Sequence, residues 1–276
     1  MNTPAINPTR KRGRGPEKVL WGRAVSWAFY DFANTIYSAL VVSYAVTVHV
    51  QEITGREWPA FVTMALSLVA SGLLLPVAGE VADRTGRAKL YLVILTVLAC
   101  LSCAAISAAG TVWLILALYF IANFCFHSCL VFYDSLLPTL APKERLGVVS
   151  GLGVGLGYAG IAFALPIGYL VLVLYRRSDP VHELTPLFAV AGALFLLFSL
   201  PLFLHVPEKA ASKRSPPGTR LLSISFKRVF VTLRALPRHK PVLLFLVGNF
   251  LCVDALNAGI FAYARYVMAV FGLDKM

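Results

Sequence analysis

Several side chains that can carry charge or form strong hydrogen bonds lie inside long apolar runs of this sequence. Asp31 and Asn34 lie in one such run, and Asp254 and Asn257 repeat the same Asp-x-x-Asn spacing in a later run. Placing an ionisable group in a nonpolar membrane environment costs at least ~2.5 kcal/mol, so each such group is a functional-site hypothesis. A carboxyl group can pair with a solute's ammonium group or carry a proton, and an amide both donates and accepts hydrogen bonds. The sequence therefore predicts that these residues bind a small polar solute, with proton coupling as one option.

A further set of polar residues lies in the run that ends near position 136. Asn123, His127 and Asp134 are spaced i, i+4 and i+11, which places them on one face of a helix. His127 is the member that titrates nearest neutral pH, which suits a proton relay, although a histidine hydrogen-bonded within a helix bundle explains it equally well. Tyr30 and Tyr37 are predicted to wall the same polar cavity.

The elements that must position these residues are membrane helices. Of 276 residues, 58% are hydrophobic and only 14% are charged, and the mean hydropathy is +0.75. A soluble domain of this length does not have such a composition, so the fold class is all-α integral membrane. Seven runs are long enough to span a bilayer as helices. They are 25–48, 59–78, 90–109, 112–132, 148–174, 186–206 and 241–262.

The basic residues predict the orientation of these spans. If the polar, basic tail 1–24 is cytoplasmic, only five of the 25 Lys and Arg residues fall on the outer side, which is a strong positive-inside bias. The same distribution explains the formal charge of +12, because cytoplasmic basic residues attract anionic lipid. No basic stripe with interleaved aromatic residues indicates nucleic-acid binding. We expect a multi-pass protein of the cell (inner) membrane, with an organelle or vacuolar membrane as the alternative.

The charged stretch Gly79 to Lys89 is predicted to be a tight hinge between the second and third spans. Gly79 permits close approach of a neighbouring helix, and Gly86 permits the positive φ that so short a reversal needs. Asp83 suits a helix end, and Arg84 and Arg87 suit the cytoplasmic surface. The predicted role is gating, and the alternative is a solvated loop without a switching role.

Two other segments have predicted structural roles. Residues 25–206 form a six-helix bundle, and 207–240 form a cytoplasmic linker with an amphipathic helix on the membrane surface, for which a calmodulin-type target helix is the alternative. Residues 241–276 contain the seventh span. The fifth span has glycines that predict close helix packing, with or without a sliding motion. These packing glycines are Gly151, Gly153, Gly155 and Gly157.

Three motifs together resemble one known family. They are Ser-Trp-Ala-Phe-Tyr-Asp-Phe-Ala-Asn-Thr at 26–35, Val-Phe-Tyr-Asp-Ser-Leu-Leu-Pro at 131–138, and Ser-Gly-Leu-Gly at 150–153 followed by Gly-Tyr at 157–158. With the 79–89 hinge, which resembles the loop between the second and third helices of major facilitator superfamily transporters, they resemble the vacuole-effluxer-like branch of that superfamily, related to the autophagy amino-acid permease. The resemblance implies two six-helix halves, alternating access and amino acids as cargo.

The chain departs from that pattern because it carries only the N-terminal six-helix half and the first helix of a second bundle. We therefore expect an incomplete chain of a secondary active transporter, or one whose second half comes from another chain. A non-transporting remnant or a membrane scaffold protein is the alternative. No nucleophile motif, metal-ligand set or paired carboxylates at one level indicate an enzyme, and no cofactor is predicted.

Overall fold

A computed structural model describes residues 16–175, 184–208, 227, 230–231, 234–252 and 255. The chain divides into two units, 1–217 and 218–276, and each is described here by itself. Within the described residues all regular structure is helical, and six helices are long and apolar enough to cross a membrane. The chain is therefore an all-α, multi-pass integral membrane protein, as its composition predicts.

The first membrane span is a continuous helix that changes its hydrogen-bonding pattern part-way. It consists of α1 (Trp21–Tyr37), a π-helical segment (Ser38–Ala45) and α2 (Val46–Thr54), and Gly55 ends it with a positive φ of 67°. A π-helical segment of this kind is uncommon and is often found at functional sites. The sequence pattern did not predict it.

The other five spans follow in order. They are α3 (Trp58–Thr85), α4 (Ala88–Ile106), α5 (Val112–Leu136), α6 (Leu146–Leu174) and α8 (Thr185–His205). Two short 3₁₀ helices, Leu137–Thr139 and Lys143–Arg145, connect α5 to α6. Each long helix buries one face and exposes many large apolar side chains on another, as expected of a bundle whose solvent is lipid.

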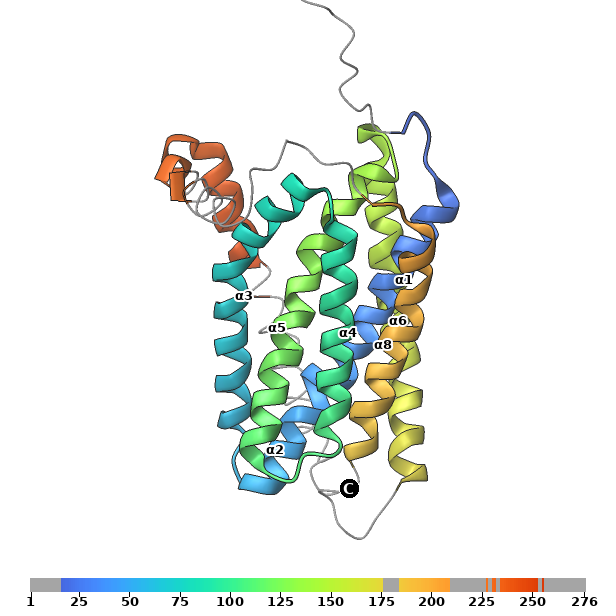
Figure 1. The fold of residues 1–276 in the computed structure, drawn as a ribbon, viewed down its shortest axis with the longest axis vertical. Helices are drawn as coiled ribbons and strands as arrows, with labels where there is room; N and C mark the ends of the chain where they lie inside the picture. Colours follow the sequence, from blue (N-terminus) through green and yellow to red (C-terminus); the bar gives the residue numbers. More distant parts are fainter. Residues whose placement is uncertain are drawn as a thin grey trace, which may run out of the picture. The chain divides into compact units, whose positions relative to one another are not determined.

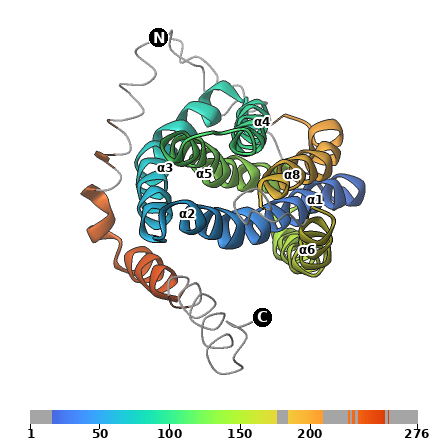
Figure 2. The same ribbon diagram turned by 90° about the horizontal axis from the view of Figure 1, so that it is seen from below.

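The helices of the first unit pack in two groups that share a central contact. In the first group α1 lies between α6 and α8, and in the second α5 lies between α3 and α4 (Figures 1 and 2). The helices α4 and α8 pack against each other and join the groups. The order of neighbours is therefore α3, α5, α4, α8, α1 and α6, so the glycine-rich α6 packs mainly on α1.

One end of this bundle carries most of its described basic residues, and we call it the basic end. There α1 begins, α3 ends and α6 begins, with Lys18, Arg87, Lys89, Lys143 and Arg145 nearby. Leu20 N donates a hydrogen bond of 2.9 Å to Leu140 O, which joins the segment before α1 to the connection between α5 and α6.

The second unit is described only in part. It contains the 3₁₀ helix Leu236–Arg238 and an apolar helix over Lys240–Cys252. The predicted amphipathic helix and the C-terminal part of the seventh span lie largely outside the described residues.

Candidate functional site

The helices α1 and α6 meet along a face of small residues. A Cβ atom at Gly160 would lie 2.7 Å from Phe32 O, and one at Gly157 would lie 3.2 Å from Thr35 Oγ1. Such spacing is too close for a side chain at Gly160 unless the helices separate. These residues therefore bring α6 against the polar face of α1 that carries Asp31.

The four glycines predicted to pack differ in their surroundings. Gly153 and Gly157 contact α1, but Gly151 and Gly155 have open space where a side chain would be. Because a helix repeats every 3.6 residues, the buried face instead continues from Gly157 to Gly160 and Gly168.

Two oxygen-bearing side chains come together beside Gly153, and the charge of a third lies near them. A Cβ atom at Gly153 would lie 3.3 Å from Asp31 Oδ2 and 3.2 Å from the Tyr133 hydroxyl. Asp134 lies within electrostatic reach of both Asp31 and Tyr133. We call Asp31, Tyr133 and Asp134 the carboxyl cluster.

The carboxyl cluster is short of partners. Tyr133 is only 3% exposed, and its buried hydroxyl has no hydrogen bond among the described residues. In the same part of the chain, no hydrogen bond or ion pair reaches the carboxyl group of the half-buried Asp31 or of the exposed Asp134. Buried polar groups in proteins normally have a hydrogen-bond partner, so the Tyr133 hydroxyl is an exception among the described residues.

Two aromatic contacts fix the Tyr133 ring. It stacks on Trp27 with ring centroids 4.2 Å apart and on Tyr30 with centroids 5.1 Å apart. The Trp27 indole N–H also donates to Tyr133 O at 3.1 Å. Both partner rings belong to α1, so the Tyr133 ring packs against the helix that carries Asp31.

The structure places Tyr30 and Tyr37 inside the bundle rather than on an open wall. Both are fully buried, and the Tyr30 hydroxyl shares a 2.8 Å hydrogen bond with Thr96 Oγ1 on α4. The Tyr37 ring packs on Phe126 and Phe195, with centroid distances of 4.9 and 5.1 Å. Their geometry is that of an aromatic core joining α1, α5 and α8.

The polar residues of α5 do not gather at one place. Asn123 Nδ2 donates a 2.6 Å hydrogen bond to Ser67 Oγ on α3, and Asn123 is fully buried. At ~1.5 Å per residue, Asn123 lies about 16 Å along the helix from Asp134. His127 is half-buried beside the Phe126 ring, 5.0 Å between centroids. Only Asp134 of this predicted set joins Asp31.

The remaining predicted residues of the solute pathway are less informative. The side-chain oxygen of Asn34 is buried and has no hydrogen bond among the described residues. Asp254 and Asn257 lie outside the described residues, so their predicted place beside Asp31 stays a prediction.

The non-helical part of the hinge is shorter than the predicted stretch Gly79 to Lys89. Helix α3 continues through Gly79 to Thr85, and only Gly86 and Arg87 separate it from α4. Charged residues at the end of a span remain helical because the helix extends beyond the apolar layer. Gly86 has a φ of 68°, as predicted, and ends α3 with a 2.8 Å hydrogen bond to Ala82 O.

The charged residues of the hinge make contacts within the first unit. Arg84 is buried and its Nε donates to Glu80 Oε1 at 2.8 Å, so it lies along α3 and does not extend outward. Lys89 Nζ donates to Val206 O at 2.7 Å, just after α8, while Arg87 is exposed. The structure does not describe the side chain of Asp83.

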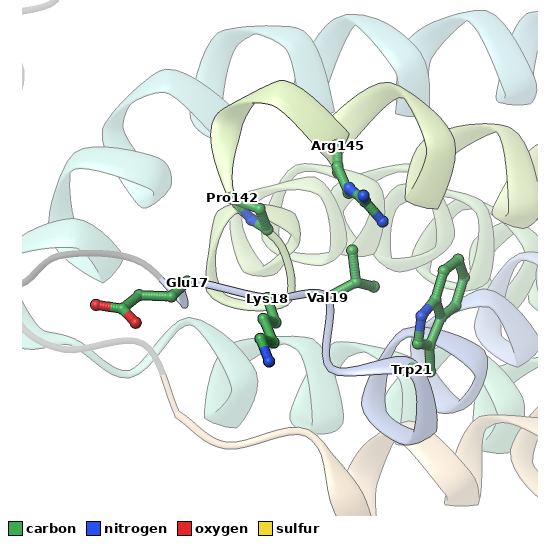
Figure 3. A pocket seen from close by; sticks show the side chains of 6 residues that line it. All are labelled: Glu17, Lys18, Val19, Trp21, Pro142 and Arg145. Carbon is green, nitrogen blue, oxygen red and sulfur yellow. The ribbon is translucent and has the colours of Figure 1, made fainter.

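A separate pocket of about 350 Å³ lies at the basic end (Figure 3). Its lining joins residues at the start of α1 and just before it to residues just before α6. The lining residues are Glu17, Lys18, Val19, Trp21, Pro142 and Arg145. None of them belongs to the predicted site, and their charges are mixed.

Sequence reasoning missed Trp27 and Tyr133 as members of the site. Both stand in the motifs at 26–35 and 131–138, each close to an aspartate, and that proximity was the available signal. Their contact with each other joins two different helices, and the spacing within either motif does not reveal it.

Comparison with known proteins supports a helical membrane protein. The family model of the Major Facilitator Superfamily matches residues 19–276. The chain belongs to this superfamily. It is a family of transporters and not of enzymes, so the prediction that the chain is not an enzyme is confirmed.

Relatives of this superfamily member are found in distant bacteria. An uncharacterized MFS-type transporter, YxiO of Bacillus subtilis (strain 168), is 27% identical over 84% of this chain. An uncharacterized protein of Aquifex aeolicus (strain VF5) is 26% identical over 96% of it. A multi-drug resistance efflux pump PmrA homolog of Lactococcus lactis subsp. lactis (strain IL1403) is 24% identical over 67% of it.

These matches cover only part of each relative. The matched regions amount to 57%, 62% and 44% of the three relatives' lengths, in the order given above. No solved structure matches the chain.

Proposed function

We propose that the chain is part of a secondary active transporter that moves a small polar solute by alternating access, with the carboxyl cluster as the solute site. The observation that carries the proposal is the half-buried Asp31 carboxyl group of a membrane helix, which lies beside the same glycine as the buried Tyr133 hydroxyl, an atom with no hydrogen bond among the described residues. Such a group is costly unless a solute or a proton uses it. Membership of a transporter superfamily supports a role in solute transport.

The fold supplies a physical basis for movement. The α6 glycines let the two helices approach closely, with Gly157 and Gly160 facing the backbone and short side chains of α1 and Gly153 facing the Trp27 ring. We propose that a shift of α6 along α1 starts at this close contact. The π-helical segment that follows α1 is a second place where the first span can change its shape. We propose that this unit works against a second bundle, as the resemblance implies, and that the α3–α4 hinge at Gly86 biases the inward-closed state.

The proposed solute carries an ammonium group. Asp31 and Asp134 supply two acceptors for it, and either carboxyl group can carry the coupling proton. Amino acids, which the resemblance to the vacuole-effluxer-like branch implies, are one class of such solutes. Efflux is the direction that this resemblance favours.

We also propose that the N-terminus is cytoplasmic and that the protein resides in the cell membrane. The support is the concentration of Lys and Arg residues at the basic end. Fusion of a periplasmic reporter enzyme after Ala109 should give activity, because that connection would face outward, and fusion after Pro142 should give none. The reverse pattern would overturn the orientation.

Flux measurements test the proposed function. The protein is reconstituted in liposomes with a trapped pH-sensitive dye, and amines, amino acids and sugars are added outside. We expect solute-dependent proton movement for an ammonium-bearing solute, and a reduction of about tenfold or more in Asp31→Asn, because the charge-assisted contact is lost.

Glu52→Gln is the matched control for this experiment. Glu52 is an exposed carboxylate at the far end of the first span, away from the carboxyl cluster. It should keep the unmodified protein's flux. Full flux in Asp31→Asn would remove Asp31 from the mechanism and refute the proposal.

A further inference from the structure

The carboxyl cluster offers oxygen acceptors and no paired cation. Asp31 Oδ2 and the Tyr133 hydroxyl lie beside Gly153, Asp134 is within electrostatic reach of both, and among the described residues no Lys or Arg side chain pairs with either carboxyl group. Tyr133 is an independent sign of a ligand, because its hydroxyl is buried beside the same glycine as Asp31, has no hydrogen bond among the described residues, and belongs to a ring that stacks on Trp27 and Tyr30.

We infer that the carboxyl cluster binds a primary amine that lacks a carboxylate, and that it discriminates against amino acids. A primary ammonium group has three N–H donors, so it can donate to Asp31 Oδ2 and to the Tyr133 hydroxyl, which lie beside the same glycine, while the nearby charge of Asp134 favours a cation. This inference rests on the proposed function and narrows its solute class.

An amino acid fits the cluster less well because of its own carboxylate. That group would enter a site that already holds two carboxyl groups, and like charges disfavour each other at such distances. Among the three side chains of the cluster, the Tyr133 hydroxyl is the one neutral hydrogen-bond donor, so an added carboxylate would find a single such donor there. An amine without a carboxylate avoids this conflict.

A metal ion fits the cluster less well than an amine. Among the described residues no group of three or more His, Cys, Asp or Glu side chains is placed to hold a metal. Two carboxyl groups and a neutral tyrosine hydroxyl offer too few strong ligands for a hard cation, which prefers six or more oxygen ligands.

Direct binding of matched ligands tests the inference. The purified full chain is titrated with phenethylamine, with phenylalanine, which adds a carboxylate, and with 2-phenylethanol, which lacks the ammonium group. We expect phenethylamine to bind about tenfold or more tightly than phenylalanine, and 2-phenylethanol not to bind. Equal or tighter binding of phenylalanine, or no binding of phenethylamine, would overturn the inference.

Variants locate the binding. Asp31→Asn should weaken phenethylamine binding about tenfold to a hundredfold, and Tyr133→Phe about threefold to tenfold, since one neutral hydrogen bond is lost. Glu52→Gln should bind as the unmodified chain does. Thermal unfolding of each variant shows that it is folded, and unchanged binding in a folded Asp31→Asn or Tyr133→Phe would contradict the assignment.

The flux experiment separates this inference from the proposed function. If amino-acid flux depends on Asp31 but phenethylamine does not bind, the transporter proposal stands and the amine inference fails. If phenethylamine binds at Asp31 but Asp31→Asn leaves every flux unchanged, the transporter proposal fails and the binding site stands.

Discussion

Polar side chains lie at both the α3–α5 and the α1–α6 contacts of this membrane bundle, but they differ in whether they have hydrogen-bond partners. Between α3 and α5, Asn123 bonds Ser67 at 2.6 Å and Ser71 bonds Ser128 at 3.2 Å. Beside the α1–α6 contact, Asp31 and Tyr133 approach the same glycine, and among the described residues neither side chain has a hydrogen-bond partner for its oxygen atoms. A polar residue with a built-in partner stabilises the bundle, whereas these two side chains leave acceptor atoms for a solute, as proposed above.

The difference shows why residue type alone is an incomplete guide. Asn123 and Asp31 are both unusual in a membrane helix and both invite a functional reading. A hydrogen-bond partner within the bundle distinguishes a structural role from a functional one. The Asn123 side-chain amide already donates to Ser67 Oγ. Its side-chain oxygen is still unpaired, so the α3–α5 contact is satisfied in most but not all of its groups.

The largest expected effect concerns the close approach of α6 to α1. Gly160→Leu should lower the free energy of unfolding by about 1–3 kcal/mol, because the new side chain meets Phe32 O, which is backbone and cannot move alone. Thermal unfolding in detergent micelles measures the change. Gly155→Leu is the control, since nothing lies near that position. Equal destabilisation by both variants would show that the contact is not close.

A smaller effect is expected on the α3–α5 side. Asn123→Leu should cost about 0.6–1.7 kcal/mol, the range measured for hydrogen bonds between membrane helices. The double variant with Ser67→Ala should cost less than the sum of the two single variants, because both remove the same bond. Strict additivity in this thermodynamic cycle would argue against that bond.

The smallest effect distinguishes two tyrosines of similar burial. Tyr30→Phe should lose about 0.6 kcal/mol because its hydroxyl bonds Thr96. Tyr133→Phe should change the free energy of unfolding by less than about 0.5 kcal/mol, since no partner among the described residues is lost. The same thermal measurement compares them, and a larger loss for Tyr133→Phe would reveal a structural bond that the account omits.

Much of the fold follows from the sequence because the bilayer imposes simple rules. Long apolar runs predict the six membrane helices, and Gly86 marks the end of α3 as its type suggests. The boundaries of α1 and α3 were predicted too short, because the helices continue into polar segments where hydropathy gives no signal. The π-helical segment 38–45 depends on packing and has no sequence signature.

The site was predictable only in part. Asp31 and Asp134 stood out because one is a carboxyl group inside a membrane span and the other lies near the end of one, and each is within electrostatic reach of the other. Tyr133 could not be assigned from its type, since a tyrosine in a membrane helix is most often packing or an interface anchor. Its role follows from a missing hydrogen bond, which is a property of three dimensions.

The central claim is that Asp31 serves transport whereas Asn123 serves stability. The most direct test measures both properties in both variants, Asp31→Asn and Asn123→Leu. We predict that Asp31→Asn unfolds at the same or a higher temperature but loses about tenfold or more of the solute flux, and that Asn123→Leu loses stability but keeps its flux per folded molecule. Loss of stability with full flux in Asp31→Asn would contradict the account.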